Sequence, residues 1–363
     1  MTKYPPFYDL LSLDNPSFPD GYLQLQRGGL PRLNGAAYRQ KTPAKNHYTL
    51  TVQQQLLTDT VLEVGYVGSK GTNVPRYAEL NTRAYTIVDG QKFFPAGSPR
   101  LNPNFDEIRP VLTDTDAHYD SLQVKFKRSS SRNLQFQVSY TFSKALDTAS
   151  TVATGDNSRE AQASLDPEDP ARDKGRASFD ATNNLTISAG YPLPFRFDQK
   201  AASVLLGGWE LSGIATFMDG QPFSARMGAE RSRNGGGGRA DRPDLKPGAN
   251  QNPVLDNPTA DRWYDPNAFV IPAIGTYGNL GRNTLVGPGR ASVDLSLSKN
   301  FPFSESVNLR FRAEFFNLLN HANFGLPRNV PLTSTGAISG SAGRITNTVT
   351  SSRQIQFGLK LTF

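Results

Sequence analysis

A group of acidic side chains close together in the sequence is the first candidate for chemistry. Asp166, Glu168, Asp169 and Asp173 fall within one short polar stretch. Carboxylate oxygens bind hard cations and pair with basic groups, so this stretch could hold a cation or contact a basic ligand. Acidic side chains at this spacing are also common in solvated loops. The four residues are therefore predicted to be candidate ligand contacts on an outer loop, without the ligand set of a metal site.

No other group of residues has the spacing of a catalytic or cofactor site. His47, His118 and His321 lie far apart in the chain, without metal-ligand spacing. The glycine run at 235–238 is followed by neither Lys-Ser nor Lys-Thr, so it does not match a phosphate-binding loop. No serine stands in a nucleophile-elbow context. The sequence predicts a non-enzymatic protein with no catalytic residue, no cofactor and no bound metal.

The composition excludes several classes of protein. Of 363 residues, 37% are hydrophobic and 20% charged, and no apolar run is long enough for a transmembrane helix. A membrane β-barrel is still allowed, because only alternate residues of its strands face lipid. The net charge of +7 comes from scattered Lys and Arg, so no nucleic-acid partner is expected. The absence of cysteine excludes disulfide scaffolds and Cys-based zinc sites.

The C-terminal stretch 353–363 has the clearest structural pattern. Its alternate residues are all apolar: Ile355, Phe357, Leu359, Leu361 and Phe363. Polar residues occupy most of the positions between them, so the stretch predicts a β-strand with one apolar face. A strand of this kind belongs either inside a β-sandwich or in the wall of an outer-membrane barrel.

Eight further strands are predicted from the same alternation, at 47–56, 61–68, 119–128, 133–144, 183–193, 208–217, 291–299 and 307–318. Short turns near 57, 130, 200 and 303 alternate with long segments at 69–118, 145–182, 218–290 and 319–352, which are predicted to be irregular loops. In an up-and-down sheet every short connection then lies at one end of the strands and every long one at the other. This asymmetry is typical of transmembrane barrels, with short periplasmic turns and long extracellular loops. The predicted fold is an all-β, antiparallel up-and-down transmembrane β-barrel.

The odd number of strands indicates an incomplete barrel. The first and the ninth predicted strands run in the same direction, whereas bacterial single-chain barrels have even numbers of antiparallel strands. Residues 1–46 are predicted to be loop without a signal peptide, and 47–363 to be the C-terminal part of the barrel. We therefore expect a fragment whose upstream strands and signal peptide are missing.

Four ordered sequence blocks resemble the barrel of Oar-like TonB-dependent receptors. They are Gly-Tyr-Val-Gly-Ser-Lys-Gly at 65–71, Ser-Tyr-Thr-Phe-Ser-Lys-Ala-Leu-Asp at 139–147, Gly-Trp-Glu-Leu-Ser-Gly-Ile at 208–214 with Gly-Gln-Pro-Phe at 220–223, and Phe-Arg-Ala-Glu-Phe-Phe-Asn-Leu-Leu-Asn-His-Ala-Asn-Phe at 311–324. The resemblance covers about residues 40–363. It implies an outer-membrane protein that takes up large nutrients through a barrel filled by a plug domain, with energy from TonB. The sequence departs from the family pattern in having no plug and no TonB box.

The resemblance also implies partners and site residues. Phe357, Leu359, Leu361 and Phe363 would form the signal read by the barrel-assembly machinery. Arg310, Arg312 and Glu314 share the polar face of their strand and would contact the plug from the lumen wall. Outer-membrane lipid would cover the apolar faces, and TonB would act only through the plug. The sequence does not identify the ligand.

A second interpretation stays open from the sequence. The chain could be a secreted or surface β-rich binding protein, similar to an adhesin or lectin, in which the apolar strand faces pack against each other in two sheets. The two interpretations differ in what covers the apolar faces: lipid in a barrel, or a second sheet in a sandwich.

Overall fold

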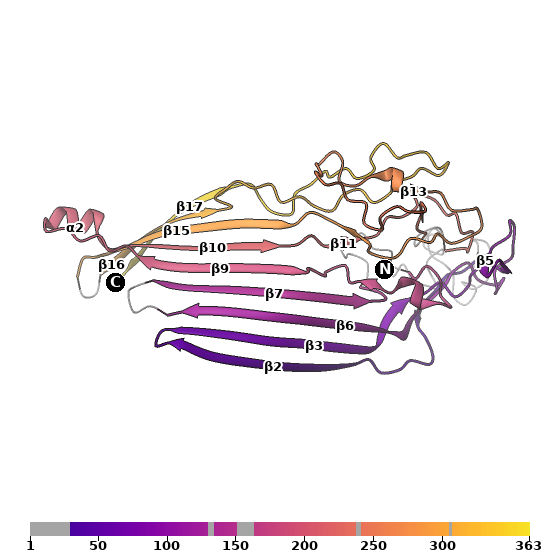
Figure 1. Cartoon of the computed structure of the whole chain (residues 1–363), viewed down its shortest axis with the longest axis horizontal. Helices are drawn as coiled ribbons and strands as arrows, with labels where there is room; N and C mark the ends of the chain where they lie inside the picture. The colour runs from indigo at the N-terminus through magenta and orange to yellow at the C-terminus, as the bar shows by residue number, and fades with distance from the viewer. Residues whose placement is uncertain (1–29, 130–133, 151–162, 237–240, 305–306) are drawn as a thin grey trace, which may run out of the picture.

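One sheet of long antiparallel strands dominates the computed structural model, which describes residues 30–129, 134–150, 163–236, 241–304 and 307–363. Nine strands follow one another in the sheet in sequence order, each antiparallel to its neighbours (Figure 1). They are β2 (Ala44–Leu57), β3 (Thr60–Tyr77), β6 (Ile108–Arg128), β7 (Gln135–Asp147), β9 (Asn183–Pro192), β10 (Trp209–Met218), β15 (Arg290–Pro302), β16 (Asn308–Phe316) and β17 (Gln354–Thr362). The predicted up-and-down order is confirmed.

Two strands are longer than the sequence pattern predicts. β3 continues to Tyr77 and β6 begins at Ile108, although 69–118 was expected to be a long irregular segment. Their pairing shifts register between Gly71 and Val74 and again between Val74 and Pro75. A bulge of this kind interrupts the alternation of side chains, so the outer parts of both strands carry no readable two-residue pattern.

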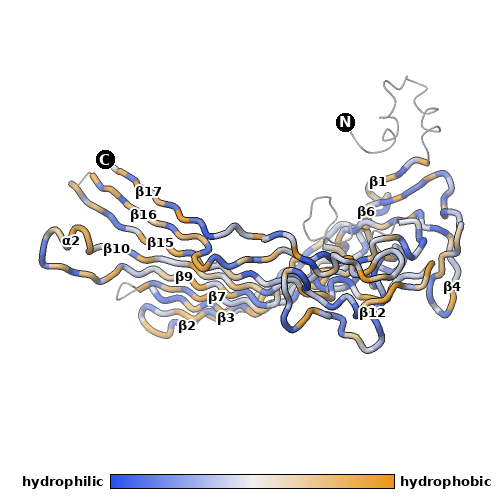
Figure 2. The backbone as a smooth tube through the Cα atoms, turned by 90° about the horizontal axis from the view of Figure 1, so that it is seen from above, coloured by the Kyte–Doolittle hydropathy of each residue, from blue (hydrophilic) through white to orange (hydrophobic). Residues whose placement is uncertain are grey.

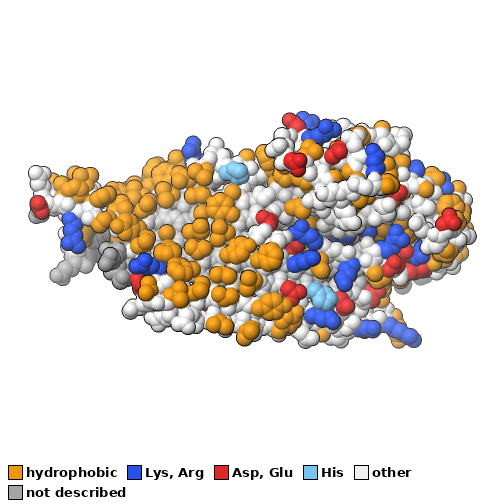
Figure 3. All heavy atoms as spheres, viewed as in Figure 1, with side chains coloured by type: hydrophobic (Ala, Val, Ile, Leu, Met, Phe, Trp, Pro, Cys, Tyr) orange, Lys and Arg blue, Asp and Glu red, His pale blue; other side chains and the backbone are white. Residues whose placement is uncertain are grey.

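The sheet has one apolar face and one polar face. A row of cross-strand neighbours on the apolar face runs through Val52, Val64, Val124, Tyr140, Leu185 and Phe217. The adjacent row on the polar face runs through Gln53, Glu63, Lys125, Ser139, Thr186 and Thr216. Figure 3 looks onto one face of the sheet, where hydrophobic side chains gather over the strands and charged ones over the loops. The apolar face has no second sheet packed on it among the described residues.

The sheet is open at both edges. Within the described residues, β2 pairs only with β3 and β17 only with β16, and every residue of both edge strands is exposed. From β2 to β17 there are nine strands, counting both, and each is antiparallel to the next, so β2 and β17 run in the same direction. Joining them directly would need a parallel seam, so the predicted incomplete barrel is confirmed as an open, curved sheet (Figure 2).

The long connections pack together at one end of the strands, and we call residues 78–107, 163–182, 219–236, 241–289 and 317–353 the loop cap (Figures 1 and 2). The loop cap contains the short strands β4 (Thr86–Val88), β5 (Gln91–Phe93), β8 (Gly175–Arg176), β11 (Pro222–Phe223), β12 (Asp244–Leu245), β13 (Phe269–Val270) and β14 (Leu285–Val286), with the 3-10 helices η2 (Pro170–Asp173) and η3 (Pro266–Ala268). Phe223, Met227, Tyr264, Phe269 and Leu285 belong to its buried hydrophobic core. The expectation of unstructured loops was wrong here, because the apolar residues of these loops meet only in three dimensions.

Two smaller elements also lie outside the predicted set. The segment 1–46, predicted as loop, contains β1 (Leu33–Ala36) and the first residues of β2, while residues 1–29 lie outside the described residues. β1 is parallel to the start of β6. The turn between β9 and β10 contains α2 (Lys200–Leu206). No helix among the described residues is long and apolar enough to cross a membrane.

Candidate functional site

The polar face of the sheet carries a broad cavity of about 540 Å³. Side chains and backbone from strands β6 to β16 line it, including Lys127, Gln137, Ser212, Asp294 and Glu314. Polar and charged groups of both signs face this space, so it is suited to water and to polar solutes rather than to an apolar ligand.

The three predicted plug contacts lie together on the polar face of β16. Arg312 Nη1 is 3.3 Å from Glu314 Oε1, so two of the three residues pair with each other. Arg310 lies directly opposite Lys360 of β17 and opposite Asn300 of β15. Like charges in directly opposed positions destabilise a sheet. This cationic pair was missed from the sequence, because the register between β16 and β17 decides which residues face each other.

Two buried polar atoms at this end of β16, one of them in Arg310 itself, have no partner among the described residues. Within the described part of the chain, neither Arg310 Nε nor Asn308 Oδ1 has a hydrogen-bond partner. Both residues belong to the end of β16 that is next to the short turns. An arginine and a lysine opposed without a carboxylate between them make this part of the polar face suited to an acidic group. The predicted plug contact itself stays a prediction.

The four acidic candidates lie in the loop cap, and three of them have partners inside the protein. Lys92 Nζ is 2.8 Å from Asp166 Oδ1 and 2.7 Å from Glu168 Oε2. The hydrogen bonds from Lys92 and Tyr85 hold the pKa of Glu168 below its usual value. Burial opposes the charge on Lys92, but the two carboxylates outweigh it and raise the pKa of Lys92. This side of the group is therefore an internal ion-pair cluster.

Asp173, like Asp166, is buried inside the loop cap. It is 3% exposed, accepts a hydrogen bond from Leu165 N, and its Oδ1 lies 2.7 Å from Arg242 Nη1. Asp169 precedes η2 and makes no capping hydrogen bond with its side chain. The geometry accounts for Asp166, Glu168 and Asp173 as structural partners of the cap, while ligand contact by any of the four stays a prediction.

Buried arginines connect the loop cap to the outer ends of the strands. Arg76 of β3 is 1% exposed, pairs with Asp114 of β6 at 2.7 and 2.8 Å, and donates to Ser164 Oγ of the cap at 2.8 Å. Arg282 reaches from the cap to Asp147 at the end of β7, at 2.7 Å. These partners lie far apart in the sequence, so nothing in the local pattern identified them. They fix the cap in one position over the sheet.

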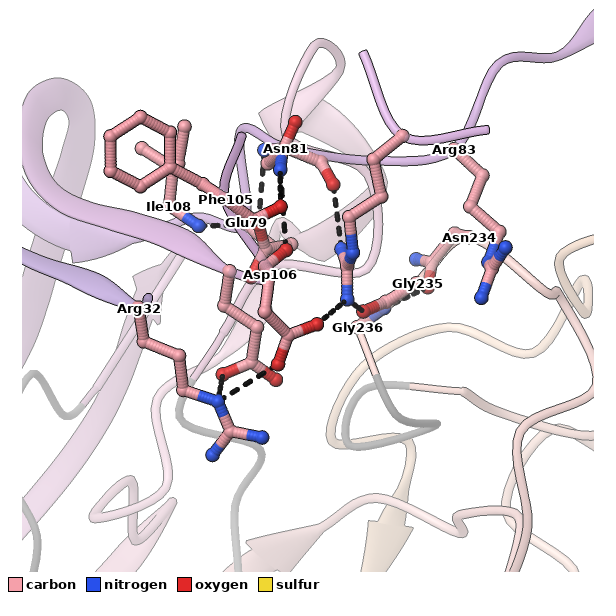
Figure 4. Close-up of polar contacts among 12 residues, drawn as sticks. Arg32, Glu79, Asn81, Arg83, Phe105, Asp106, Ile108, Asn234, Gly235 and Gly236 are labelled. Carbon is pink, nitrogen blue, oxygen red and sulfur yellow. Dashed lines mark hydrogen bonds and ion pairs between the residues drawn. The ribbon is translucent and has the colours of Figure 1, made fainter. Parts of the chain in front are cut away.

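A second polar cluster lies where β3 enters the cap (Figure 4). Asn81 Nδ2 donates to the carbonyl oxygens of Asn102, Phe105 and Asp106. Glu79 accepts hydrogen bonds from the backbone of Asn81 and Ile108. Burial raises the pKa of Glu79 to about 7, although these backbone donors oppose the shift. These hydrogen bonds hold residues 79–81, at the start of the cap, against residues 102–108.

The predicted assembly signal forms an edge of the sheet. Phe357, Leu359 and Leu361 of β17 lie on the apolar face, 68%, 72% and 54% exposed, and Phe363 follows at 92%. Phe357 stacks against Phe311 of β16, with ring centroids 6.3 Å apart. An exposed apolar strand edge is accessible to another chain. Recognition by assembly machinery stays a prediction.

Sequence comparison gives the decisive assignment. The family model for "outer membrane beta barrel domain" matches residues 6–356. The chain belongs to this family. No curated protein sequence matches it.

The solved structures similar to this outer membrane β-barrel protein include a transporter and a porin. The outer membrane transporter YddB from Escherichia coli is 12% identical with a TM-score of 0.46, over 92% of this chain and 34% of the transporter. The NanC porin is 8% identical with a TM-score of 0.19, over 88% of this chain and 97% of the porin. The chain thus spans about a third of the transporter that it matches.

Family membership gives the two faces of the sheet their surroundings. As an outer-membrane β-barrel protein, the chain has its apolar face toward lipid and its polar face toward the barrel interior. The short turns lie on the periplasmic side, and the loop cap lies outside the cell. The cavity lined by Lys127 and Glu314 therefore belongs to the interior wall of the barrel.

Proposed function

We propose that the protein is the C-terminal barrel portion of an Oar-like TonB-dependent transporter, which takes up a ligand across the outer membrane. The observation that carries the proposal is a sheet with an exposed apolar face, a polar inner face and a packed external cap. The four sequence blocks that resemble Oar-like receptors support the finer assignment.

Additional strands complete the barrel in this proposal. Because β2 and β17 run in the same direction, an odd number of strands must fill the gap if every seam is to be antiparallel. These strands, a plug domain and a signal peptide would belong to the complete transporter. Whether one longer chain or a second polypeptide supplies them is tested by sequencing the DNA upstream of Met1.

The plug would contact the polar face of β16 in the complete transporter. Arg310 and Lys360 oppose each other without a carboxylate at their rows, which suits an acidic side chain of a plug. Arg312 and Glu314 form the adjacent pair. TonB would act only through that plug, and the barrel-assembly machinery would bind the strand that ends in Phe363.

The alternative of a secreted adhesin or lectin receives no support from the sheet. It requires two sheets with their apolar faces packed together, whereas Leu50 and Val52 on the apolar face are 71% and 64% exposed.

The experiment for membrane insertion is gel migration before and after heating. Protein extracted from outer membranes should migrate faster unheated than heated, because a folded barrel resists detergent. Leu50→Cys should react with a maleimide confined to the lipid phase, while Thr51→Cys on the opposite face should not. A monodisperse soluble protein in detergent-free buffer would refute the proposal.

A further inference from the structure

The inner face of the sheet changes character near the loop cap. In the middle of the strands it is polar, as in the row through Glu63, Lys125 and Ser139. Toward the outer ends, Val67, Ala117 and Tyr119 face the same side. A barrel wall that lines water is normally polar, so this apolar part of the inner face is suited to contact an apolar group.

Three segments enclose the apolar part as a pocket. Strands β2, β3, β6 and β7 form its floor, the chain that enters β2 contributes Pro43, and the cap contributes Ala177 and Phe179. The volume is about 540 Å³, within the usual range for small-molecule sites. We call it the inner pocket, and its main lining residues are Lys45, His47, Val67, Val74, Ala117 and Tyr119.

The pocket is set into the wall by its own backbone. Lys41 N donates to Thr113 Oγ1, and Asn73 Nδ2 donates to the carbonyl of Thr42, so the segment that enters β2 is held against β3 and β6. Ala145 and Ala177 line the pocket with small side chains and are only 4% and 1% exposed. The pocket is therefore a preformed feature of the wall.

The charges around the pocket favour an anion at one end. Lys45 is exposed beside the pocket, and its ammonium group has no hydrogen-bond or ion-pair partner in the part of the chain that the structure describes. Asp147 is the acidic residue of the lining, and Arg282 pairs with it at 2.7 Å. The remaining uncompensated charge at the pocket is therefore positive, and His47 adds a hydrogen-bonding group next to it on β2.

We propose that the inner pocket binds an aromatic carboxylate, with its ring among Val67, Val74 and Tyr119 and its carboxylate at Lys45. An aromatic ring matches the apolar floor and the phenol of Tyr119, and a carboxylate forms a charge-assisted hydrogen bond with the lysine. The inference rests on the proposed function in one respect: it takes the polar face as the wall of a transport lumen. It adds a class of ligand to that function.

Because the chain has no cysteine, single-cysteine variants test the proposal in the full chain. Ala117→Cys places a thiol in the pocket, and Ser139→Cys places one on the same face outside it. The rate of reaction with N-ethylmaleimide is measured in outer membranes with and without 1-naphthoate. At a concentration near ten times the dissociation constant, naphthoate should slow labelling of Ala117→Cys about tenfold and leave Ser139→Cys unchanged.

Two controls define the ligand class. Adding Lys45→Gln should raise the naphthoate concentration needed to protect Ala117→Cys about tenfold, whereas adding Lys125→Gln should not change it. The neutral amide 1-naphthamide should protect much less than naphthoate. Equal protection by the amide, protection of Ser139→Cys, or no protection at about 1 mM naphthoate would each overturn the proposal.

The membrane placement is read separately. Lipid-phase labelling of Leu50→Cys reports on the barrel function whether or not naphthoate binds. Labelling at Leu50 without protection at Ala117 refutes the ligand class alone. Protection at Ala117 without labelling at Leu50 keeps the pocket and refutes the barrel function.

Discussion

Placing an arginine on either face of β6 tests the orientation of the sheet most directly. Val124 lies on the apolar face, four residues from Asp120 and four from Arg128, the polar residues that limit that face along the strand. At about 3.3 Å per residue, Val124 is about 13 Å along the strand from each of these two residues, so it lies at the middle of the apolar band. Its neighbour Gln123 points to the polar face.

The two substitutions should differ strongly in the free energy of unfolding. An arginine at the midplane on the lipid side costs about 2–4 kcal/mol, which lowers the folding equilibrium constant about 30- to 1,000-fold. An arginine at position 123 faces the polar interior and should change stability by only about 0.5 kcal/mol. The difference between Val124→Arg and Gln123→Arg is therefore the measured quantity.

The assay is unfolding by guanidinium in phosphatidylcholine vesicles, followed by the unheated gel mobility of the folded form. Fluorescence of Trp209, which lies opposite Lys299 of β15 and whose ring packs edge-on against Phe311, gives a second signal. Val124→Ala controls for the loss of the valine side chain. Equal destabilisation by both arginines, or a larger effect at position 123, would refute the assignment of the apolar face to lipid.

Three further predictions concern the cap and the terminal strand. Arg242→Met leaves Asp173 buried without its cation and should destabilise the cap by about 3–5 kcal/mol. Proteolysis within 219–289 should then be faster while the gel mobility of the folded barrel is retained, and an unchanged rate of proteolysis would contradict the prediction. Burial raises the pKa of Glu79 from 4.5 to about 7, so the folded state binds the extra proton, and the free energy of unfolding should fall by at most about 3 kcal/mol as pH rises through that window. Hydrogen exchange of the Ile108 amide should show this pH dependence and Glu79→Gln should remove it; an unchanged dependence in the variant would exclude Glu79 as its source. Deleting Phe363 should reduce the amount of inserted protein in cells without changing its unfolding midpoint in vesicles, and normal insertion would argue against its role in assembly.

The sequence by itself determined the strands and their faces. Successive side chains of a strand point to opposite sides, so alternation such as that of Phe357, Leu359 and Leu361 follows from local backbone geometry. The lengths of the connections then fixed the up-and-down order, and the odd number of strands indicated open edges. These properties can be predicted from the order of residues along the chain, without knowledge of contacts between distant segments.

Only the tertiary structure decided the cap, the ion pairs and the inner pocket. Arg282 and Asp147 are 135 positions apart, and Arg242 and Asp173 are 69 apart, so no local pattern connects them. The acidic group that looked free in the sequence is largely paired, because the fold brings Lys92 and Arg242 to it. The opposition of Arg310 and Lys360 depends on the register between two strands joined by a long loop. Contacts of this kind depend on how the chain packs in space, which alternation along a strand does not encode.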